Sequence, residues 1–213
     1  AMTVSLLITN AYLYVDREWE IPNGWVALKD SRVHSVGHSG DTPPPAEKTL
    51  SANGKLVTPG LINAHHHMYQ NLTRAYAPVT NGTLIEWLQG LYPLWAGLDE
   101  ESVYLSTAVA MIELLMGGCT TSMDHMYVHS KPFLIDAQFR AAKDIGFRFH
   151  ATRGSMTRSV DDGGLPPAPV VQDEDTIPAD SERLAHAYHA ASPGAMGRFA
   201  LAPTDLIRNL ESR

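Results

Sequence analysis

The pattern of apolar and polar positions changes near residue 56. Before that point, short apolar runs at residues 6–8, 12–14, 25–28 and 33–36 alternate with polar segments. Typical turn residues separate these runs, namely Asn23 with Gly24, Asp30 with Ser31, and Gly37. The pattern predicts short β-strands joined by turns over residues 1–55.

Beyond residue 55, apolar runs of strand length alternate with segments of helical periodicity. Helix 99–116 is the clearest, because Asp99 can cap it and Gly117 can end it. Its predicted apolar stripe consists of Tyr104, Ala108, Met111, Ile112 and Leu115. Further helices are predicted at 133–145 and 181–191, and strands at 56–67, 119–123, 147–151 and 199–202. This alternation favours four βα units with a parallel sheet over residues 56–213.

Three consecutive histidines end the first of these later strands. On a strand, side chains two residues apart share a face, so His65 and His67 point together and His66 points away. Two imidazoles converging from one strand end make half of a metal site. An H-x-H pair alone is a weak signal, because surface histidines produce it too.

Pro59, Gly60, the apolar pair Leu61 and Ile62, and Asn63 precede these histidines. Together they resemble the first-strand motif of the amidohydrolase superfamily. The resemblance implies a metal-dependent (β/α)8 barrel, a TIM-like α/β fold of which residues 56–213 would supply strands 1–4. It also implies that residues 1–55 form the N-terminal part of a small β-sandwich domain.

Gln70 and Trp87 extend this resemblance toward one branch of the superfamily. The spacing H-x-H-x-x-Q is similar to that of deaminases acting on purine-like rings, where the resemblance gives Gln70 a substrate hydrogen bond. The segment around Trp87 resembles a pocket cover, with Trp87 stacked on a flat ring. The alternatives are a loop amide for Gln70 and a core residue for Trp87. Arg153 and the loop after it look like those of 8-oxoguanine deaminases and hydroxyatrazine aminohydrolases.

The resemblance implies a hydrolase that replaces a ring amino group by attack of metal-activated hydroxide, releasing ammonia. 8-Oxoguanine is the first expected substrate, and the cofactor is one divalent metal, Zn²⁺ or alternatively Fe²⁺. The alternatives are a triazine alkylamino- or chlorohydrolase and a non-catalytic metal-binding scaffold. The family's His-x-x-Glu proton shuttle and final Asp ligand have no counterpart in this sequence, so no catalytic residue is assigned.

Composition and length narrow the picture further. The 213 residues carry a net charge of −7 without a basic run, which argues against nucleic acid as a partner. No apolar stretch is long enough to span a membrane and no signal peptide is evident, so we expect a cytoplasmic enzyme acting on a small heterocycle. A homo-oligomer is also expected. A complete barrel needs about 250 residues, so we expect a fragment or a chain with a gap, one candidate being Pro203 and Thr204.

Overall fold

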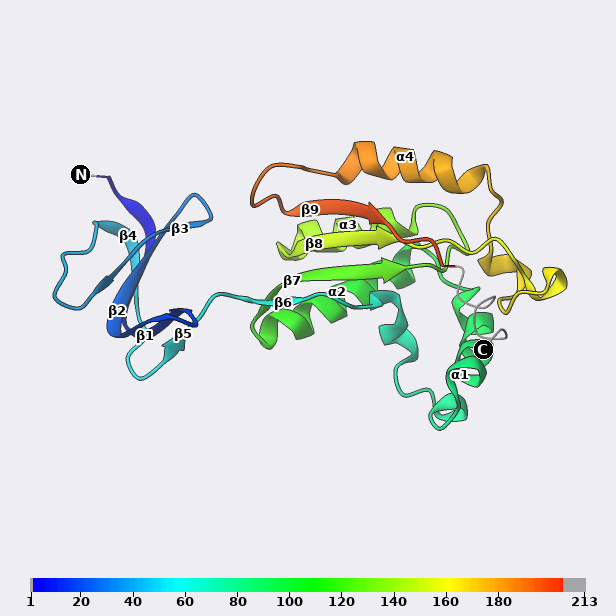
Figure 1. Cartoon of the computed structure of the whole chain (residues 1–213), viewed down its shortest axis with the longest axis horizontal. Helices are drawn as coiled ribbons and strands as arrows, with labels where there is room; N and C mark the ends of the chain where they lie inside the picture. Colours follow the sequence, from blue (N-terminus) through cyan, green and yellow to red (C-terminus); the bar gives the residue numbers. More distant parts are fainter. Residues whose placement is uncertain (1, 205–213) are drawn as a thin grey trace. The chain divides into compact units, whose positions relative to one another are not determined.

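The computed structural model describes residues 2–204. By its internal contacts the chain divides into two compact units, residues 1–60 and residues 61–213. Figure 1 shows the first unit as strands and loops, and the second as strands accompanied by helices.

The first unit is a five-stranded sheet. Its strands are β1 (Val4–Asp16), β2 (Trp19–Lys29), β3 (Arg32–His38), β4 (Ala46–Ser51) and β5 (Leu56–Val57), in the order β3-β2-β1-β4, with β5 also paired to β1. β1, β2 and β3 form an antiparallel meander, and β4 and β5 run parallel to β1. The two apolar runs predicted at 6–8 and 12–14 therefore belong to one long strand.

The predicted turns are right in one place and wrong in two. Asp30 and Ser31 form the β2–β3 turn with φ of 51° and 60°, the left-handed backbone that tight hairpin turns require. Gly24 and Gly37 lie within strands instead. At Gly37 an added Cβ would lie 2.3 Å from Cζ2 of Trp25, so this glycine makes room for an indole ring.

The second unit contains a four-stranded, fully parallel sheet in the order β6-β7-β8-β9. Its strands are β6 (Leu61–Asn63), β7 (Cys119–Met126), β8 (Arg148–Arg153) and β9 (Gly197–Leu201). The α-helices are α1 (Leu84–Trp95), α2 (Glu100–Met116), α3 (Leu134–Ile145) and α4 (Thr176–Tyr188). The 3₁₀ segments are η1 (Met68–Thr73), η2 (Ala77–Val79), η3 (Val160–Asp162) and η4 (Ala168–Val170). The predicted alternation of parallel strands and helices is confirmed.

The predicted boundary between the two domains, at residues 55 and 56, lies a few residues too early in the sequence. Leu56 and Val57 pair with β1, so they belong to the N-terminal sheet and not to the first barrel strand. Pro59 and Gly60 then separate β5 from β6. Proline cannot donate to a strand ladder, which explains the break at this point.

Helix α2 confirms its predicted ends but not its predicted apolar stripe. The Asp99 side chain accepts a hydrogen bond from the Ser102 amide and caps the helix. Of the five stripe residues only Met111 is fully buried, together with the unpredicted Val103, Thr107 and Ala110. Leu105, Val109, Ile112 and Met116 are exposed. The helix carries apolar residues around most of its surface, so periodicity could not identify the buried face.

Helix α4 begins five residues before its predicted start. Asp173 explains the difference, because its carboxylate accepts hydrogen bonds from the amide and the hydroxyl of Thr176. Pro178 is tolerated near this end, where helical amides lack partners. The end of the segment predicted to hold four βα units, residues 205–213, lies outside the described residues.

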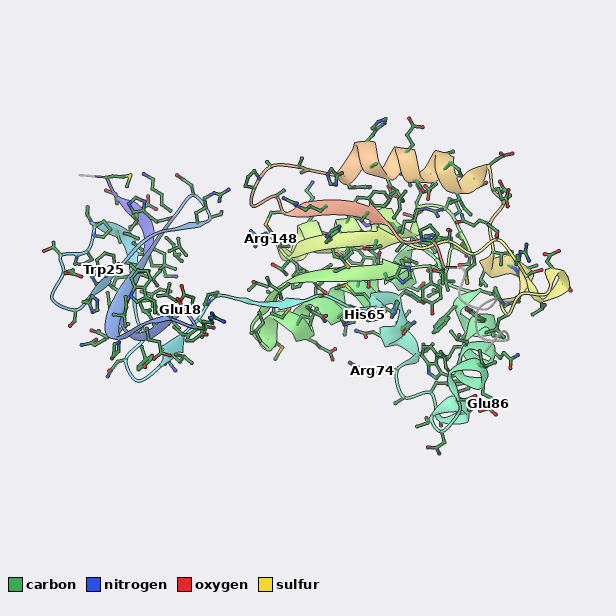
Figure 2. The ribbon with its side chains drawn as sticks, in the orientation of Figure 1. Glu18, Trp25, His65, Arg74, Glu86 and Arg148 are labelled. Carbon is green, nitrogen blue, oxygen red and sulfur yellow. The ribbon has the colours of Figure 1, made fainter. Side chains whose placement is uncertain are left out.

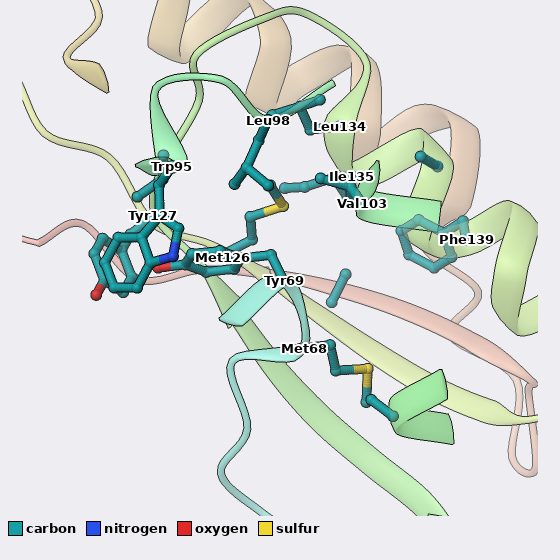
Figure 3. Packing of buried hydrophobic residues seen from close by; sticks show 14 of the residues in the cluster. Met68, Tyr69, Trp95, Leu98, Val103, Met126, Tyr127, Leu134, Ile135 and Phe139 are labelled. Carbon is teal, nitrogen blue, oxygen red and sulfur yellow. The ribbon is translucent and has the colours of Figure 1, made fainter. Parts of the chain in front are cut away.

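A large apolar cluster holds the second unit together. Figure 3 shows part of it, with Met68, Tyr69, Trp95 and Met126 packed between η1, α1 and the sheet. No helix in the described part of the chain is long and apolar enough to cross a membrane.

Candidate metal centre and substrate cavity

The three histidines lie in the loop between β6 and η1, just after the strand ends. Figure 2 shows His65 at this point. The side chain of Asn63 accepts a hydrogen bond from the His65 amide at 2.9 Å, and the His66 carbonyl accepts one from the His125 amide at 2.8 Å. The ring centroids of His65 and His67 are 4.9 Å apart. The two rings therefore lie together although the histidines are not on a strand.

The imidazole of His67 is oriented for ligation. Its Nδ1 lies 2.6 Å from the backbone oxygen of His125. A carbonyl oxygen only accepts, so Nδ1 carries the proton and Nε2 keeps a free lone pair. Burial lowers the pKa of His67, which favours the neutral ring. This combination, one nitrogen anchored to a carbonyl and the other free, is characteristic of metal-binding histidines.

His66 has a different environment. Burial lowers its pKa, and the charges of Glu113 and Arg74 act on it in opposite directions. These two residues form a bidentate ion pair, both N–O distances being 2.9 Å, which connects the segment after η1 to α2. Ligation by His65 and His67, with His66 turned away, stays a prediction.

Asp124 holds the end of the histidine loop from within the core. This β7 residue is fully buried and accepts hydrogen bonds from the Met68 amide at 2.6 Å and from Nε2 of Gln138 at 2.7 Å. Burial raises the pKa of Asp124 to about 7, and the two hydrogen bonds oppose that rise. The Met68 carbonyl accepts from the Ser106 hydroxyl at 2.6 Å. Met68, the residue after His67, is thus held through both its backbone amide and its backbone carbonyl.

A cavity of about 450 Å³ opens beside these histidines. Its lining includes all three histidines, Gln70 and Trp87, so His66 reaches the same cavity as His65 and His67. The Trp87 ring packs edge-on against Trp95, with centroids 5.3 Å apart. The structure therefore brings the two proposed metal ligands and the two proposed substrate-binding residues to one cavity.

Two further groups near His67 come from the end of β7 and the residue just after it. The rings of His125 and Tyr127 lie 5.5 Å and 5.4 Å from the His67 ring. Nε2 of His125 is 3.0 Å from the Ala202 carbonyl, which ties this ring to the segment after β9. Strand-end residues face the mouth of a parallel barrel, so their position along the chain is the signal that indicates them.

The donor set fits a divalent metal in part. Imidazole nitrogen is a common ligand of zinc and iron, and His67 presents its Nε2 in the suitable tautomer. Four-coordinate zinc needs more donors than two. Across residues 2–204 no group of three or more His, Cys, Asp or Glu side chains is arranged to hold a metal ion. If His65 and His67 are ligands, as predicted, donors beyond this pair must complete the site.

Comparison with known proteins decides the family. Residues 56–206 match the amidohydrolase family. This chain belongs to that family. The amidohydrolase chain is 45% identical over 183 residues to 8-oxoguanine deaminase of Pseudomonas aeruginosa, covering 84% of this chain and 41% of the relative. It is 42% identical to hydroxydechloroatrazine ethylaminohydrolase of Pseudomonas sp., covering 75% of this chain and 34% of the relative.

Solved structures extend the likeness to the fold. A triazine hydrolase from Arthrobacter aurescens superimposes with a TM-score of 0.85 at 28% identity, covering 93% of this amidohydrolase chain and 46% of the neighbour. An atrazine chlorohydrolase from the same species, complexed with zinc, gives a TM-score of 0.84. The second unit is therefore part of a TIM-barrel-like α/β fold. The chain spans less than half the length of these relatives.

Proposed function

We propose that the protein to which this chain belongs is a metal-dependent hydrolytic deaminase of a purine-like heterocycle, with 8-oxoguanine as the first candidate. The observation that carries the proposal is the single cavity that His65, His67, Gln70 and Trp87 share. The 45% identity to an 8-oxoguanine deaminase supports the choice of substrate. Clefts and cavities of roughly 300–1,000 Å³ are typical of small-molecule sites.

His65 and His67 would hold one divalent metal, Zn²⁺ or alternatively Fe²⁺. When bound, such a metal supplies Lewis-acid activation of water. The carbonyl of His125 keeps the His67 ring in the ligating tautomer, and Asp124 keeps the loop in place. The net reaction adds water to the ring carbon that bears the amino group and releases ammonia, leaving a ring lactam.

Gln70 and Trp87 would bind the heterocycle. Trp87 is half-buried at the cavity, where its indole face can cover a flat ring. Gln70 is also half-buried and can hydrogen-bond a polar ring edge. The proton shuttle and the remaining metal ligands are assigned to no residue of this chain.

A triazine hydrolase is the second candidate, supported by an ethylaminohydrolase relative and by triazine hydrolase structures. The decisive experiment is steady-state amine release by the full-length, metal-loaded protein. Guanine, 8-oxoguanine, isoxanthopterin, cytosine and hydroxyatrazine are the substrates. We expect ammonia release with the highest kcat/KM on 8-oxoguanine. Ethylamine release from hydroxyatrazine alone would favour the triazine hydrolase, and no amine from any substrate would favour a non-catalytic scaffold.

Three further proposals concern the whole protein. The N-terminal sheet would be one layer of a small β-sandwich, because Val33, Leu50 and Leu56 leave apolar surface exposed on it. We also propose a homo-oligomer and a cytoplasmic location. The presence of a single cysteine, the buried Cys119, fits a reducing compartment.

A further inference from the structure

Gln70 lies in η1, three residues after His67, and its amide N–H donates to the His67 carbonyl at 3.0 Å. This backbone bond ties the position of Gln70 to the histidine loop. The side chain lies at the cavity, as described above. Its orientation therefore decides which group a bound heterocycle meets beside His67.

Two tyrosines hold the amide nitrogen of this side chain. Nε2 of Gln70 donates to the hydroxyl of Tyr69 at 3.3 Å and to the hydroxyl of Tyr127 at 3.4 Å. Tyr69 is completely buried and Tyr127 is 8% exposed. Burial raises the pKa of both phenols, so both remain protonated and neutral at physiological pH.

The tyrosine rings are themselves held firmly. Tyr69 packs edge-on against Trp95 at 5.3 Å and against Tyr127 at 5.8 Å. Figure 3 shows these three rings together in the core. Tyr127 also lies against Gly154, where an added Cβ would come within 2.4 Å of the Tyr127 Cβ. A rigid pair of hydroxyls therefore faces Gln70 from the protein side.

A primary amide has two N–H donors and one carbonyl acceptor. With both donors directed at the tyrosine oxygens, the carbonyl oxygen is the group that Gln70 offers to a bound molecule. We propose that Tyr69 and Tyr127 fix Gln70 with its carbonyl oxygen toward the cavity, so that the site selects heterocycles presenting an N–H group at this edge. The inference rests on the proposed function, and it makes Gln70 a specificity residue and the tyrosines positioning residues.

The selection follows from the polarity of the contact. A ring N–H or exocyclic amino group can donate to the Gln70 oxygen. A ring carbonyl or a methylated ring nitrogen at the same edge would leave that oxygen unpaired or meet it as a second acceptor. Sites built around a specific hydrogen bond discriminate strongly against analogues that lack it.

The first test compares Gln70→Glu with Gln70→Ala, using 8-oxoguanine or the best substrate of the wild-type enzyme. Glutamate keeps an acceptor toward the cavity and can accept from the tyrosine hydroxyls, but it has no N–H to donate. Gln70→Ala should lower kcat/KM roughly ten- to a hundred-fold with unchanged metal content, because one hydrogen bond to a polar edge is lost. Gln70→Glu should stay above Gln70→Ala. A Gln70→Glu enzyme less active than Gln70→Ala would show that Gln70 donates, and would overturn the inference.

The second test measures discrimination between the substrate and its derivatives methylated at each ring nitrogen. The variant is Tyr127→Phe, which removes the hydroxyl that accepts from Gln70 Nε2 and keeps the aromatic ring at position 127. Its matched control is Tyr92→Phe, since Tyr92 packs on Trp95 in the same cluster but directs its hydroxyl to Sδ of Met156 at 3.6 Å.

We expect the wild-type kcat/KM for one methylated derivative to be at least about ten-fold lower than that for the substrate. Tyr127→Phe and Gln70→Ala should reduce this ratio of kcat/KM values, whereas Tyr92→Phe should leave it unchanged. Binding of the same derivatives to the metal-free protein, measured by calorimetry, gives a readout independent of turnover. If Tyr127→Phe and Tyr92→Phe give the same ratios, the inference fails even though the enzyme is a deaminase. If the metal-loaded wild-type enzyme deaminates none of the substrates, the proposed function is wrong and the inference that rests on it falls with it.

Discussion

At the scale of single residues, the structure supplies partners that the sequence does not reveal. The spacing of His65 and His67 indicates a shared direction, and the rings do lie together. Their anchoring by the His125 carbonyl and by Asp124 depends on residues about 57 positions away along the chain, which no local pattern predicts. For Gln70, Tyr69 is the adjacent residue, whereas the second partner, Tyr127, lies 57 positions away just after β7.

Asp124→Ala tests the support of the histidine loop. The change leaves the Met68 amide and Nε2 of Gln138 without their acceptor inside the core. Each unpaired buried donor costs about 1–3 kcal/mol, so a clear fall in the unfolding midpoint and weaker zinc binding are expected. Asp144→Ala is the control, because Asp144 is an exposed α3 carboxylate bonded to Tyr104. Equal effects of the two changes, measured by urea denaturation and zinc titration, would refute this role of Asp124.

His129 should make the protein less stable in acid. It is buried just after β7, and burial, followed by the charge of Arg153, lowers its pKa to about 4. In the unfolded chain the pKa is near 6.5, so the native state binds fewer protons between these values. The free energy of unfolding therefore decreases by about 3 kcal/mol as the pH falls from 6.5 to 4. His129→Gln keeps a donor toward the Gly154 carbonyl and should flatten this dependence in urea denaturation at pH 5–7. An unchanged slope would contradict the assignment.

Among the secondary-structure elements, several predicted ends are confirmed, although α4 begins earlier than predicted. The Asp99 cap of α2, the end of α3 at Ile145 and the turn at Asp30 and Ser31 depend on local signals, and all three are confirmed. The buried face of α2 was predicted wrongly, since tertiary packing chooses among several apolar faces. Gly24 and Gly37 lie in strands and not in the predicted turns, because glycine serves close packing as well as turns.

Two helix caps provide a matched pair for testing the role of α1. Thr83 caps α1, which carries Trp87, and Asp99 caps α2. Replacing either by alanine should cost about 1 kcal/mol of stability. Only Thr83→Ala should weaken heterocycle binding, by roughly two- to five-fold, because it loosens the helix beside the cavity. Dissociation constants and unfolding midpoints for both variants check this. A weaker affinity in Asp99→Ala alone would remove α1 from the cavity's function.

At the scale of the whole molecule, the barrel unit has an open apolar side. β6 is an edge strand of the described sheet, with Leu61 60% and Ile62 74% exposed. Helix α2 also exposes apolar side chains, those of Leu105, Val109, Ile112 and Met116. Open strand edges with apolar side chains promote association. The relatives, which are more than twice as long, have further chain to cover such a surface.

Residues 1–213 produced alone should therefore bind a hydrophobic dye and self-associate. Met116→Glu, at a position 85% exposed, should reduce dye binding without changing the far-ultraviolet circular dichroism spectrum. Light scattering and dye fluorescence provide the measurements. A monomer of 23.3 kDa that unfolds cooperatively and binds no dye would contradict this expectation.

We expect His65 and His67, and not His66, to hold the metal. The most direct measurement is the metal content of the purified full-length protein by plasma emission spectrometry, for wild type, His66→Ala and the double variant His65→Ala/His67→Ala. Circular dichroism confirms folding of each protein. We expect about one divalent metal per chain in wild type and His66→Ala, and strong loss in the double variant. Full metal content in the double variant, or loss of metal in His66→Ala alone, would show that His65 and His67 are not the ligand pair.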